Sequence, residues 1–192
     1  FVGNLVENQG LELVIEATAE IVKTIPNFRA LIIGSGPREG VLKELVKKKG
    51  LEKHLIFLGF IRDENEVHRI LTSCSAGIAP YVPDPYSLVN YAYPGKVRVY
   101  IECGVPVIMT RISDMAGEIE RFKAGYVVRY DKNQLSDAII KVLSDDVLFQ
   151  ELRRNTRELA AMYTVEYILD RAFVQSREKF LGSEALNKVY HD

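Results

Sequence analysis

The chain has 192 residues, 47% of them apolar, so it is long enough for one domain with a full hydrophobic core. Its formal net charge of −1, with Lys and Arg spread along the whole chain, excludes the concentrated basic surface of a nucleic-acid-binding protein. Because no apolar run approaches the ~20 residues that span a bilayer, we expect a cytoplasmic protein without a transmembrane segment, or one peripheral to the membrane in its full-length form.

The first residues, FVGN, have the pattern of a strand, and because residue 1 is Phe and not Met we expect the native chain to begin further upstream. A helix is predicted next, since apolar residues recur at helical spacing over residues 11–25 and the pattern ends at Pro26. Short apolar runs bounded by turn residues then predict buried parallel strands at 29–34, 55–60, 76–81, 106–110 and 125–130. Helices are expected between them, at 39–49, 64–73, from residue 94, at 116–122 and at 134–143.

Strands that alternate with helices predict a parallel sheet covered by helices on both faces. The expected fold is therefore α/β, a doubly wound Rossmann-like domain over residues 1–144. Residues 145–192 contain only helical patterns, and we expect two helices there that pack on this domain or on a missing neighbouring domain.

Several residues that could carry chemistry have a simpler interpretation. Cys74 and Cys103 lie in apolar runs without metal-ligand spacing, so both are interpreted as buried thiols. His54 and His68 are expected to be solvated. The loop acids Asp63, Asp84 and Asp114 form no pair with ligand spacing, so we predict no metal, and no catalytic residue can be named.

Three loops are candidates for anion binding, because ligands of open parallel sheets lie at the carboxyl ends of strands, where helix N-termini present free N–H groups. These are residues 2–10, the GSGP turn at 34–37, and the start of the helix at residue 94. In the last, Pro94 suits a first helical turn, Gly95 permits close approach of a ligand, and Lys96 supplies a charge. The alternative is a plain helix start with a solvated Lys96.

Six segments, FVGNLVENQGLELVIEA, LIIGSGP, LIFLGFI, GIAPY, YPGKVRVYIECGVPVI and AGYVV, resemble in order and spacing the C-terminal, donor-binding half of a retaining GT-B glycosyltransferase of the group 1 type. The resemblance covers about residues 1–143. It implies a UDP-, GDP- or ADP-sugar as donor, no separate cofactor, and an acceptor glycan or lipid held by an absent N-terminal domain. The isolated chain is then expected to be inactive.

The resemblance also implies which residues bind the donor. They are Gly3, Asn4, Gln9, Gly34, Gly36, Phe60, Arg62, Tyr91, Pro94, Gly95, Lys96, Val97 and Val99. Among the tyrosines, Tyr100 is interpreted as core, and Tyr86 and Tyr91 in the long loop are the candidates for stacking on a sugar or base.

The chain departs from the family pattern at three of these positions. Asn4 and Gln9 stand where the family usually has Arg and Lys, and Val99 stands where it has a carboxylate for the ribose hydroxyls. Glu102 lies about 300° around the helix from Val99 and does not replace it. The alternative is a degenerate, non-catalytic donor domain that acts as a scaffold or partner subunit. A third hypothesis is a sugar-nucleotide enzyme of the same architecture, such as a hydrolysing epimerase.

Lys96 is left as the main fixed charge of the predicted anion site. If a diphosphate binds there, Lys96→Ala should weaken its binding by about 1–3 kcal/mol. A solvated lysine at a helix start should contribute little to folding.

Overall fold

The computed structural model describes residues 1–86, 94–164 and 173. The strands are β1 (Ala30–Ile33), β2 (Leu55–Gly59), β3 (Gly77–Ala79), β4 (Val107–Thr110) and β5 (Gly125–Val128). The helices are α1 (Leu11–Thr24), α2 (Glu39–Lys48), α3 (Glu64–Thr72), α4 (Gly95–Glu102), α5 (Met115–Arg121), α6 (Lys132–Ser144) and α7 (Asp146–Ala161), with a short 3-10 turn η1 (Glu7–Gln9). The predicted elements in this range are confirmed, except that the predicted strand at residues 1–4 is only an isolated bridge at Val2. The second helix predicted after residue 145 lies outside the described residues.

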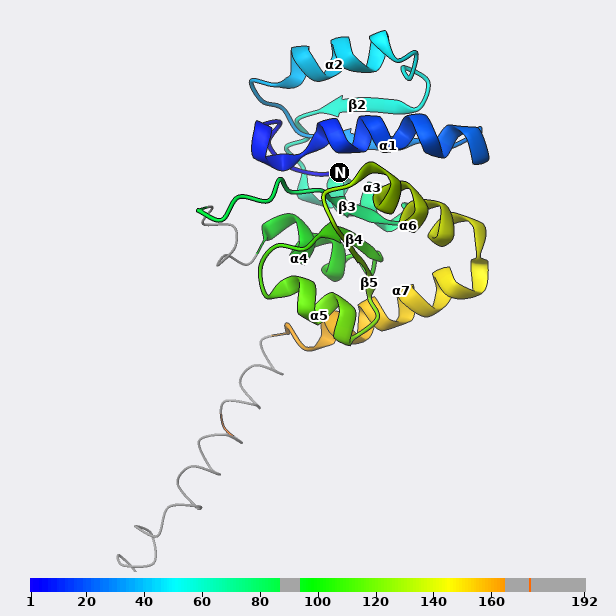
Figure 1. Ribbon diagram of the computed structural model, residues 1–192. Helices are drawn as coiled ribbons and strands as arrows, with labels where there is room; N and C mark the ends of the chain where they lie inside the picture. The colour runs from blue at the N-terminus through cyan, green and yellow to red at the C-terminus, as the bar shows by residue number, and fades with distance from the viewer. Residues whose placement is uncertain (87–93, 165–172, 174–192) are drawn as a thin grey trace, which may run out of the picture.

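All strand pairs are parallel, as predicted, but their hydrogen bonds form two groups. β1 pairs with β2, and β3, β4 and β5 pair in that order. Between the groups, residues 1–3 run beside β1: Val2 forms an isolated parallel bridge to Ile33. Figure 1 shows the N-terminus at the centre of the molecule, between the two groups of strands.

The Tyr100 side chain connects residue 2 with β3 at this point. The Val2 N–H donates to the hydroxyl of Tyr100 at 3.0 Å, and this hydroxyl donates to the Ile78 carbonyl at 3.1 Å. Tyr100 is fully buried, which confirms its interpretation as a core residue. Its hydroxyl thus replaces a strand-to-strand hydrogen bond between residue 2 and β3.

Removing that hydroxyl tests its role. Tyr100→Phe is expected to lower the free energy of unfolding by about 1–3 kcal/mol, because a partly buried N–H and a buried carbonyl both lose a partner. Urea denaturation measures this change, and Tyr130→Phe, at a side chain 36% exposed, is the control. Equal stability of the two variants would show that the hydroxyl bridge contributes nothing.

Helices cover both faces of the strands, as the doubly wound prediction requires. In β4, Ile108 belongs to one buried cluster, and Val107 and Met109 belong to the other. The first cluster is built with α1, α2 and α6, and the second with α4 and α5. In Figure 1, α1 and α6 lie side by side in front of the strands, consistent with the close packing of these two helices.

Helix α7 packs on the domain and joins its two cores. Leu152 belongs to the first cluster and Leu159 to the second, and α7 contacts both α6 and α4. The Asp145 side chain caps α7 by accepting a hydrogen bond from the Leu148 N–H at 2.9 Å. Helix α7 therefore packs on this domain, and the prediction for the remaining C-terminal residues is not tested.

Two expectations about surface and membrane can be compared with the structure. Cys74 and Cys103 are free thiols that are half-buried, so their interpretation as buried thiols is confirmed only in part. No helix among residues 1–86 and 94–164 is long and apolar enough to cross a membrane.

Candidate functional site

The loops predicted to bind an anion meet at the carboxyl ends of the strands. The first loop and the loop after β1 are tied together by main-chain hydrogen bonds, from Leu5 N–H to the Ser35 carbonyl and from Arg38 N–H to the Leu5 carbonyl, both at 3.0 Å. The Gly34 N–H donates to the Gly59 carbonyl at 2.7 Å, which brings in the end of β2. The three segments thus form one continuous rim.

Two glycines make this close approach possible. Gly34 has φ +131°, and a Cβ placed there would lie 1.9 Å from the Gly3 carbonyl oxygen. A Cβ on Gly36 would lie 2.5 Å from the Leu5 carbonyl oxygen. Both positions need glycine because neighbouring main chain occupies the space of a side chain.

The first loop also reaches the loop after β3 and the start of α4. The Val82 N–H donates to the Asn8 carbonyl at 3.0 Å. Gln9, in η1, accepts a hydrogen bond through its side-chain oxygen from the Lys96 ammonium. Gln9 and Lys96, 87 positions apart in the chain, are therefore in direct contact.

The surroundings of Lys96 differ from those of a solvated lysine at a helix start. Its side chain is only 8% exposed, so the expectation of a solvated lysine is wrong. The ammonium lies 3.9 Å from the centre of the Phe1 ring and 4.4 Å from that of Tyr81. The reason is that the first residues and the end of β3 converge on the start of α4 and enclose the lysine stem.

This enclosure changes the electrostatics of Lys96. Burial lowers the pKa of its ammonium to about 7. The two aromatic rings act in the opposite direction, because the ring faces attract a cation. Burial also raises the pKa of the Tyr81 hydroxyl, so Tyr81 acts as a neutral ring beside the lysine.

The start of α4 has the geometry of an open helix N-terminus. Pro94 is the N-cap and accepts the first helical hydrogen bonds, from Val97 and Arg98. The N–H groups of Gly95 and Lys96 precede these bonds, as those of a first helical turn do. Gly95 is exposed, and no atom of the described residues is given within 4 Å of the position of a Cβ there, so these residues leave this end of the helix open to a ligand.

The two valines of α4 do not face this opening in the same way. Val97 is fully buried in the second core cluster, and its N–H is bonded to the Pro94 carbonyl. Val99 is half-buried and packs against the same cluster. Position 99 is therefore partly exposed, and a side chain there can reach a ligand only from its exposed side.

The remaining predicted donor residues lie on the rim or outside it. Asn4 and Arg62 are exposed, and Phe60 is 72% exposed at the end of β2. Tyr91 lies outside the described residues. Tyr86 is 92% exposed.

Sequence reasoning missed three residues of this region. Phe1 and Tyr81 form the two rings around the Lys96 ammonium, and neither was among the predicted donor-binding residues. Arg38 lies beside the first loop and pairs with Glu12 at 2.5 Å. Arg38 could have been found from the sequence, because it directly follows the GSGP turn that was predicted to bind an anion.

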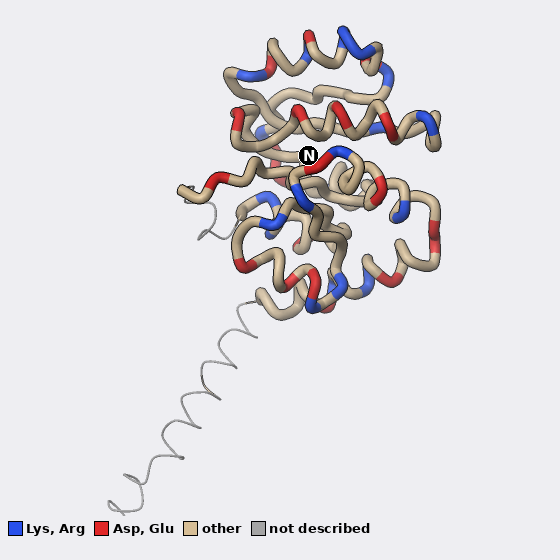
Figure 2. The backbone as a smooth tube through the Cα atoms, viewed as in Figure 1, with Lys and Arg blue, Asp and Glu red and all other residues tan. Residues whose placement is uncertain are grey.

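Some of the other groups considered for chemistry have structural partners. His54 is half-buried, with its Nδ1 3.0 Å from the Phe28 carbonyl, so it is not simply solvated, whereas His68 is exposed as expected. Asp63 caps α3 by accepting from the Asn65 N–H. Figure 2 shows acidic and basic residues interspersed along the described helices, and no group of three or more potential metal ligands occurs in residues 1–86 and 94–164.

Comparison with curated proteins places this arrangement in context. The model of the family "Glycosyl transferases group 1" matches residues 1–161. The chain is 26% identical over 146 residues to N-acetyl-alpha-D-glucosaminyl L-malate synthase of Bacillus anthracis, covering 76% of this chain and 35% of that protein. It is 26% identical over 170 residues to alpha-D-kanosaminyltransferase of Streptomyces kanamyceticus, covering 86% of this chain and 41% of that protein. The chain thus spans less than half the length of these relatives.

Solved structures show the same fold. The C-terminal domain of LpcC, a glycosyl transferase group 1 family protein of Francisella tularensis, superposes with a TM-score of 0.70 at 24% identity, covering 85% of this chain and 83% of that domain. A variant of S. aureus TarM in complex with fondaparinux, alpha-GlcNAc-glycerol and UDP superposes with a TM-score of 0.74 at 20% identity, covering 90% of this chain and 34% of that chain. Because both identities are below 25%, these similarities establish the fold alone.

Proposed function

The chain belongs to the glycosyl transferases group 1 family, and from this premise we propose that it binds a nucleoside-diphosphate sugar at the rim formed by its first loop, the Gly34–Gly36 loop and the start of α4. The observation that carries the proposal is the open N-terminus of α4 beside a buried cation, Lys96. Such an end attracts an anion through its free N–H groups and its positive dipole.

The proposed role in transfer is stabilisation of the leaving diphosphate. In glycosyl transfer the bond between the anomeric carbon and the diphosphate breaks, the diphosphate keeps the electron pair, and an acceptor hydroxyl bonds to the carbon and loses its proton. Fixed positive charge and oriented N–H groups stabilise the charge that develops on the diphosphate. Lys96 and the first amides of α4 would supply both.

The finer parts of the proposal follow the family pattern. We place the acceptor, a glycan or a lipid, on a separate N-terminal domain, and propose that the sugar is transferred with retention at the anomeric carbon. The donor is proposed to be a UDP-, GDP- or ADP-sugar bound without a metal. The chain itself is proposed to hold the donor, and no residue of it is assigned as the acceptor's base.

Calorimetric titration of the chain with UDP-glucose, GDP-mannose and ADP-glucose at low ionic strength tests this proposal. One of the three is expected to bind, and its affinity is expected to fall by about tenfold between about pH 6 and pH 8.5, because the Lys96 ammonium loses its proton as the pH rises. The sign follows from the pKa of about 7: the charged form that attracts an anion predominates below it. The phosphates of a sugar nucleotide keep their charges over this range.

The result that contradicts the proposal is the absence of heat at millimolar concentrations of all three donors. Binding without the pH dependence would retain the donor site and exclude Lys96 from it. A chain variant that lacks the lysine gives the corresponding control at each pH.

A second candidate function is a non-catalytic donor-domain scaffold, and one contact favours it. Lys96 is already satisfied within the protein, by the Gln9 side chain and the two rings, so it can serve to tie the first loop to α4. Under this alternative Lys96 is structural, and none of the three donors binds.

A further inference from the structure

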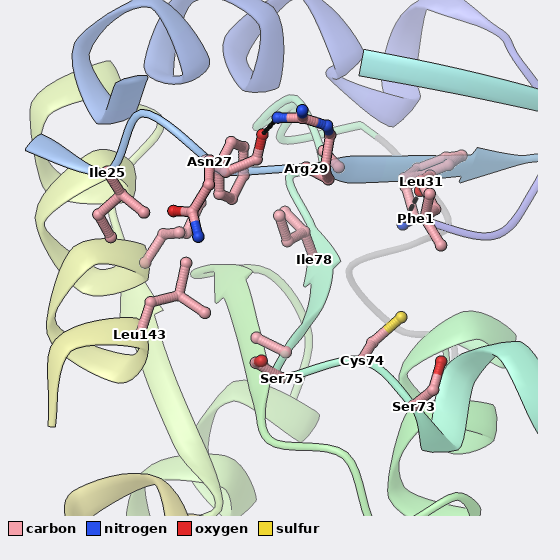
Figure 3. Close-up of a pocket in the computed structure, with 14 residues that line it drawn as sticks. Phe1, Ile25, Asn27, Arg29, Leu31, Ser73, Cys74, Ser75, Ile78 and Leu143 are labelled. Atoms are coloured by element: carbon pink, nitrogen blue, oxygen red, sulfur yellow. Dashed lines mark hydrogen bonds between the residues drawn. The ribbon is translucent and has the colours of Figure 1, made fainter. Parts of the chain in front are cut away.

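The strand β2 forms an outer edge of the strand arrangement. Among the described residues it pairs only with β1, through a parallel ladder. On its other side, β1 borders a cavity of about 410 Å³ that separates it from the segment leading into β3. Figure 3 shows this cavity with Leu31 of β1 on one side and Cys74 and Ser75 on the other. The edge of β2 that faces away from β1 is therefore left unpaired by the described residues.

The main chain of β2 presents hydrogen-bonding groups at this outer edge. In a parallel ladder, successive residues direct their N–H and carbonyl to opposite sides of the strand. The His54 carbonyl accepts a hydrogen bond from the Ala30 N–H in β1 at 2.7 Å, so by alternation the outward residues are Leu55 and Phe57. The Leu55 N–H is already bonded to the Leu51 carbonyl at 3.0 Å. Phe57 is thus the residue of β2 that offers both a donor and an acceptor at the outer edge.

One face of β2 is also uncovered. Leu55 is buried in the first core cluster and Phe57 packs against it. Because side chains alternate between the two faces of a strand, Ile56 and Leu58 point to the opposite face. They are 37% and 40% exposed and belong to neither core cluster. This face of β2 therefore presents a short apolar stripe to solvent in the described part of the chain.

The strand at the other end, β5, differs in this respect. Tyr126 packs against the first core cluster and Val127 against the second, and both α5 and α6 contact this strand. Both faces of β5 are thus covered. An edge strand without charged side chains and with an exposed apolar face is a ready template for pairing with another chain. Of these two edge strands, β2 fits that description.

We propose that β2 is an interface at which two copies of this chain pair, as antiparallel strands related by a two-fold axis at Phe57. In this arrangement Phe57 of each copy lies opposite Phe57 of the other, and the two residues exchange both N–H···O hydrogen bonds. Two-fold symmetry makes the surface complementary to itself, so that each contact occurs twice. The interface is separate from the proposed donor function and does not depend on it.

This register covers the apolar stripe. With Phe57 opposite Phe57, Ile56 of one copy lies directly opposite Leu58 of the other. The two form a non-hydrogen-bonded pair, in which the Cα atoms are about 4.5 Å apart and the side chains are in contact. The same pair occurs again on the other side of the axis. All four exposed side chains of the two stripes are then buried against each other.

The charges of α2 also favour a second copy as the partner. Glu39 lies in the first turn of this helix, and Lys47 and Lys48 lie in the last. Figure 1 shows α2 beside β2 at one end of the molecule. A two-fold axis perpendicular to the strands places the two α2 helices on the same face and antiparallel, so the acidic end of each is directed toward the basic end of the other. Such complementary charges fix the register of an interface.

Sedimentation velocity over a series of protein concentrations tests the pairing. The parent chain is expected to shift reversibly from monomer to dimer as its concentration rises. Leu58→Lys is expected to raise the dimer dissociation constant by about tenfold or more, because the lysine occurs twice in the dimer and faces an apolar side chain each time. Val147→Lys, at a side chain that is 80% exposed in α7, is the matched control and is expected to dimerise like the parent.

Disulfide formation tests the register itself. Cys74 and Cys103, the two cysteines of the chain, are first replaced by alanine. Ile56→Cys and Leu58→Cys are then made separately in this background. Positions 56 and 58 of two paired copies are within the Cα separation of a disulfide, whereas 56–56 and 58–58 contacts are diagonal, at about 7–8 Å. Mild oxidation of a mixture of the two variants is expected to give at least several-fold more covalent dimer than either variant alone.

Three outcomes would overturn the proposal. A parent chain that stays monomeric at all concentrations has no such interface. Equal dissociation constants for the parent and Leu58→Lys place the contact between the copies elsewhere on the surface. Covalent dimer that forms as readily from one cysteine variant alone as from the mixture excludes the register about Phe57.

Discussion

Lys96→Met is expected to weaken binding of a nucleoside-diphosphate sugar by about 1–3 kcal/mol, the range for a hydrogen bond to a charged group. Methionine keeps an apolar stem of similar length between the Phe1 and Tyr81 rings, so the loss is one of charge and not of packing. Calorimetric titration at low ionic strength and about pH 6.5, below the pKa of about 7 where the parent lysine is mostly charged, measures the difference. Equal affinity of parent and variant would exclude Lys96 from the site.

The same variant is expected to fold more stably than the parent below about pH 7, by about 1–3 kcal/mol, because a buried charge is replaced by a buried apolar group. The sign follows from the pKa, which is lowered from 10.5 in a free lysine to about 7 in the folded protein. Between these values the unfolded chain binds more protons, so the parent gains stability as the pH rises from about 7 toward 10.5. Urea denaturation at several pH values should show that slope in the parent and a smaller one in Lys96→Met.

Lys96→Ala is the companion variant that separates charge from packing. It also removes the stem that lies 3.3 Å from the Cβ position of Gly3 and beneath the two rings, so it is expected to be less stable than Lys96→Met. From the sequence, Lys96 was expected to contribute little to stability. Because the side chain is buried, we now expect Lys96→Ala to lower the free energy of unfolding. If the alanine and methionine variants are equally stable, the stem does not support the first loop.

Gly34→Ala is expected to destabilise the fold by about 4 kcal/mol or more, at the upper end for single substitutions. Its φ of +131° is unfavourable for any L side chain, and the new Cβ would lie 1.9 Å from the Gly3 carbonyl oxygen. Because the obstacle is main chain, it can be relieved only by moving the first loop, whose Gly3 N–H is bonded to the Ile33 carbonyl. Loss of donor binding should accompany the loss of stability.

Gly40→Ala is the matched control for this substitution. Gly40 lies in α2 and nothing is within 4 Å of its Cβ position. Alanine there is expected to leave donor binding unchanged and to raise stability by about 0.5–1 kcal/mol, the usual advantage of alanine over glycine in a helix. Urea denaturation measures both variants, and a Gly34→Ala chain as stable as the parent would show that the two loops do not need their close contact.

The amino-acid sequence was sufficient for the order of the elements and the position of the rim. Strands such as residues 30–33 are short apolar runs, helices such as α1 have one apolar stripe, and both patterns are local, so they can be recognised without knowing the partners. Parallel strands have their carboxyl ends at one edge, so the loops after them were expected to meet. The glycines at 34 and 36 and the proline at 94 marked those loops for the same local reason.

The surroundings of single side chains were decided by the tertiary structure alone. The burial of Lys96 depends on Phe1, Gln9 and Tyr81, which come from three other segments, and no spacing within one segment encodes that contact. Likewise, the hydrogen bonds of the Tyr100 hydroxyl to Val2 and Ile78 join segments that are far apart in the sequence. Local patterns determined which elements form and where a ligand can approach, whereas charge state and hydrogen-bond partners arise from long-range packing, which fixes the distance of each group from water and from its neighbours.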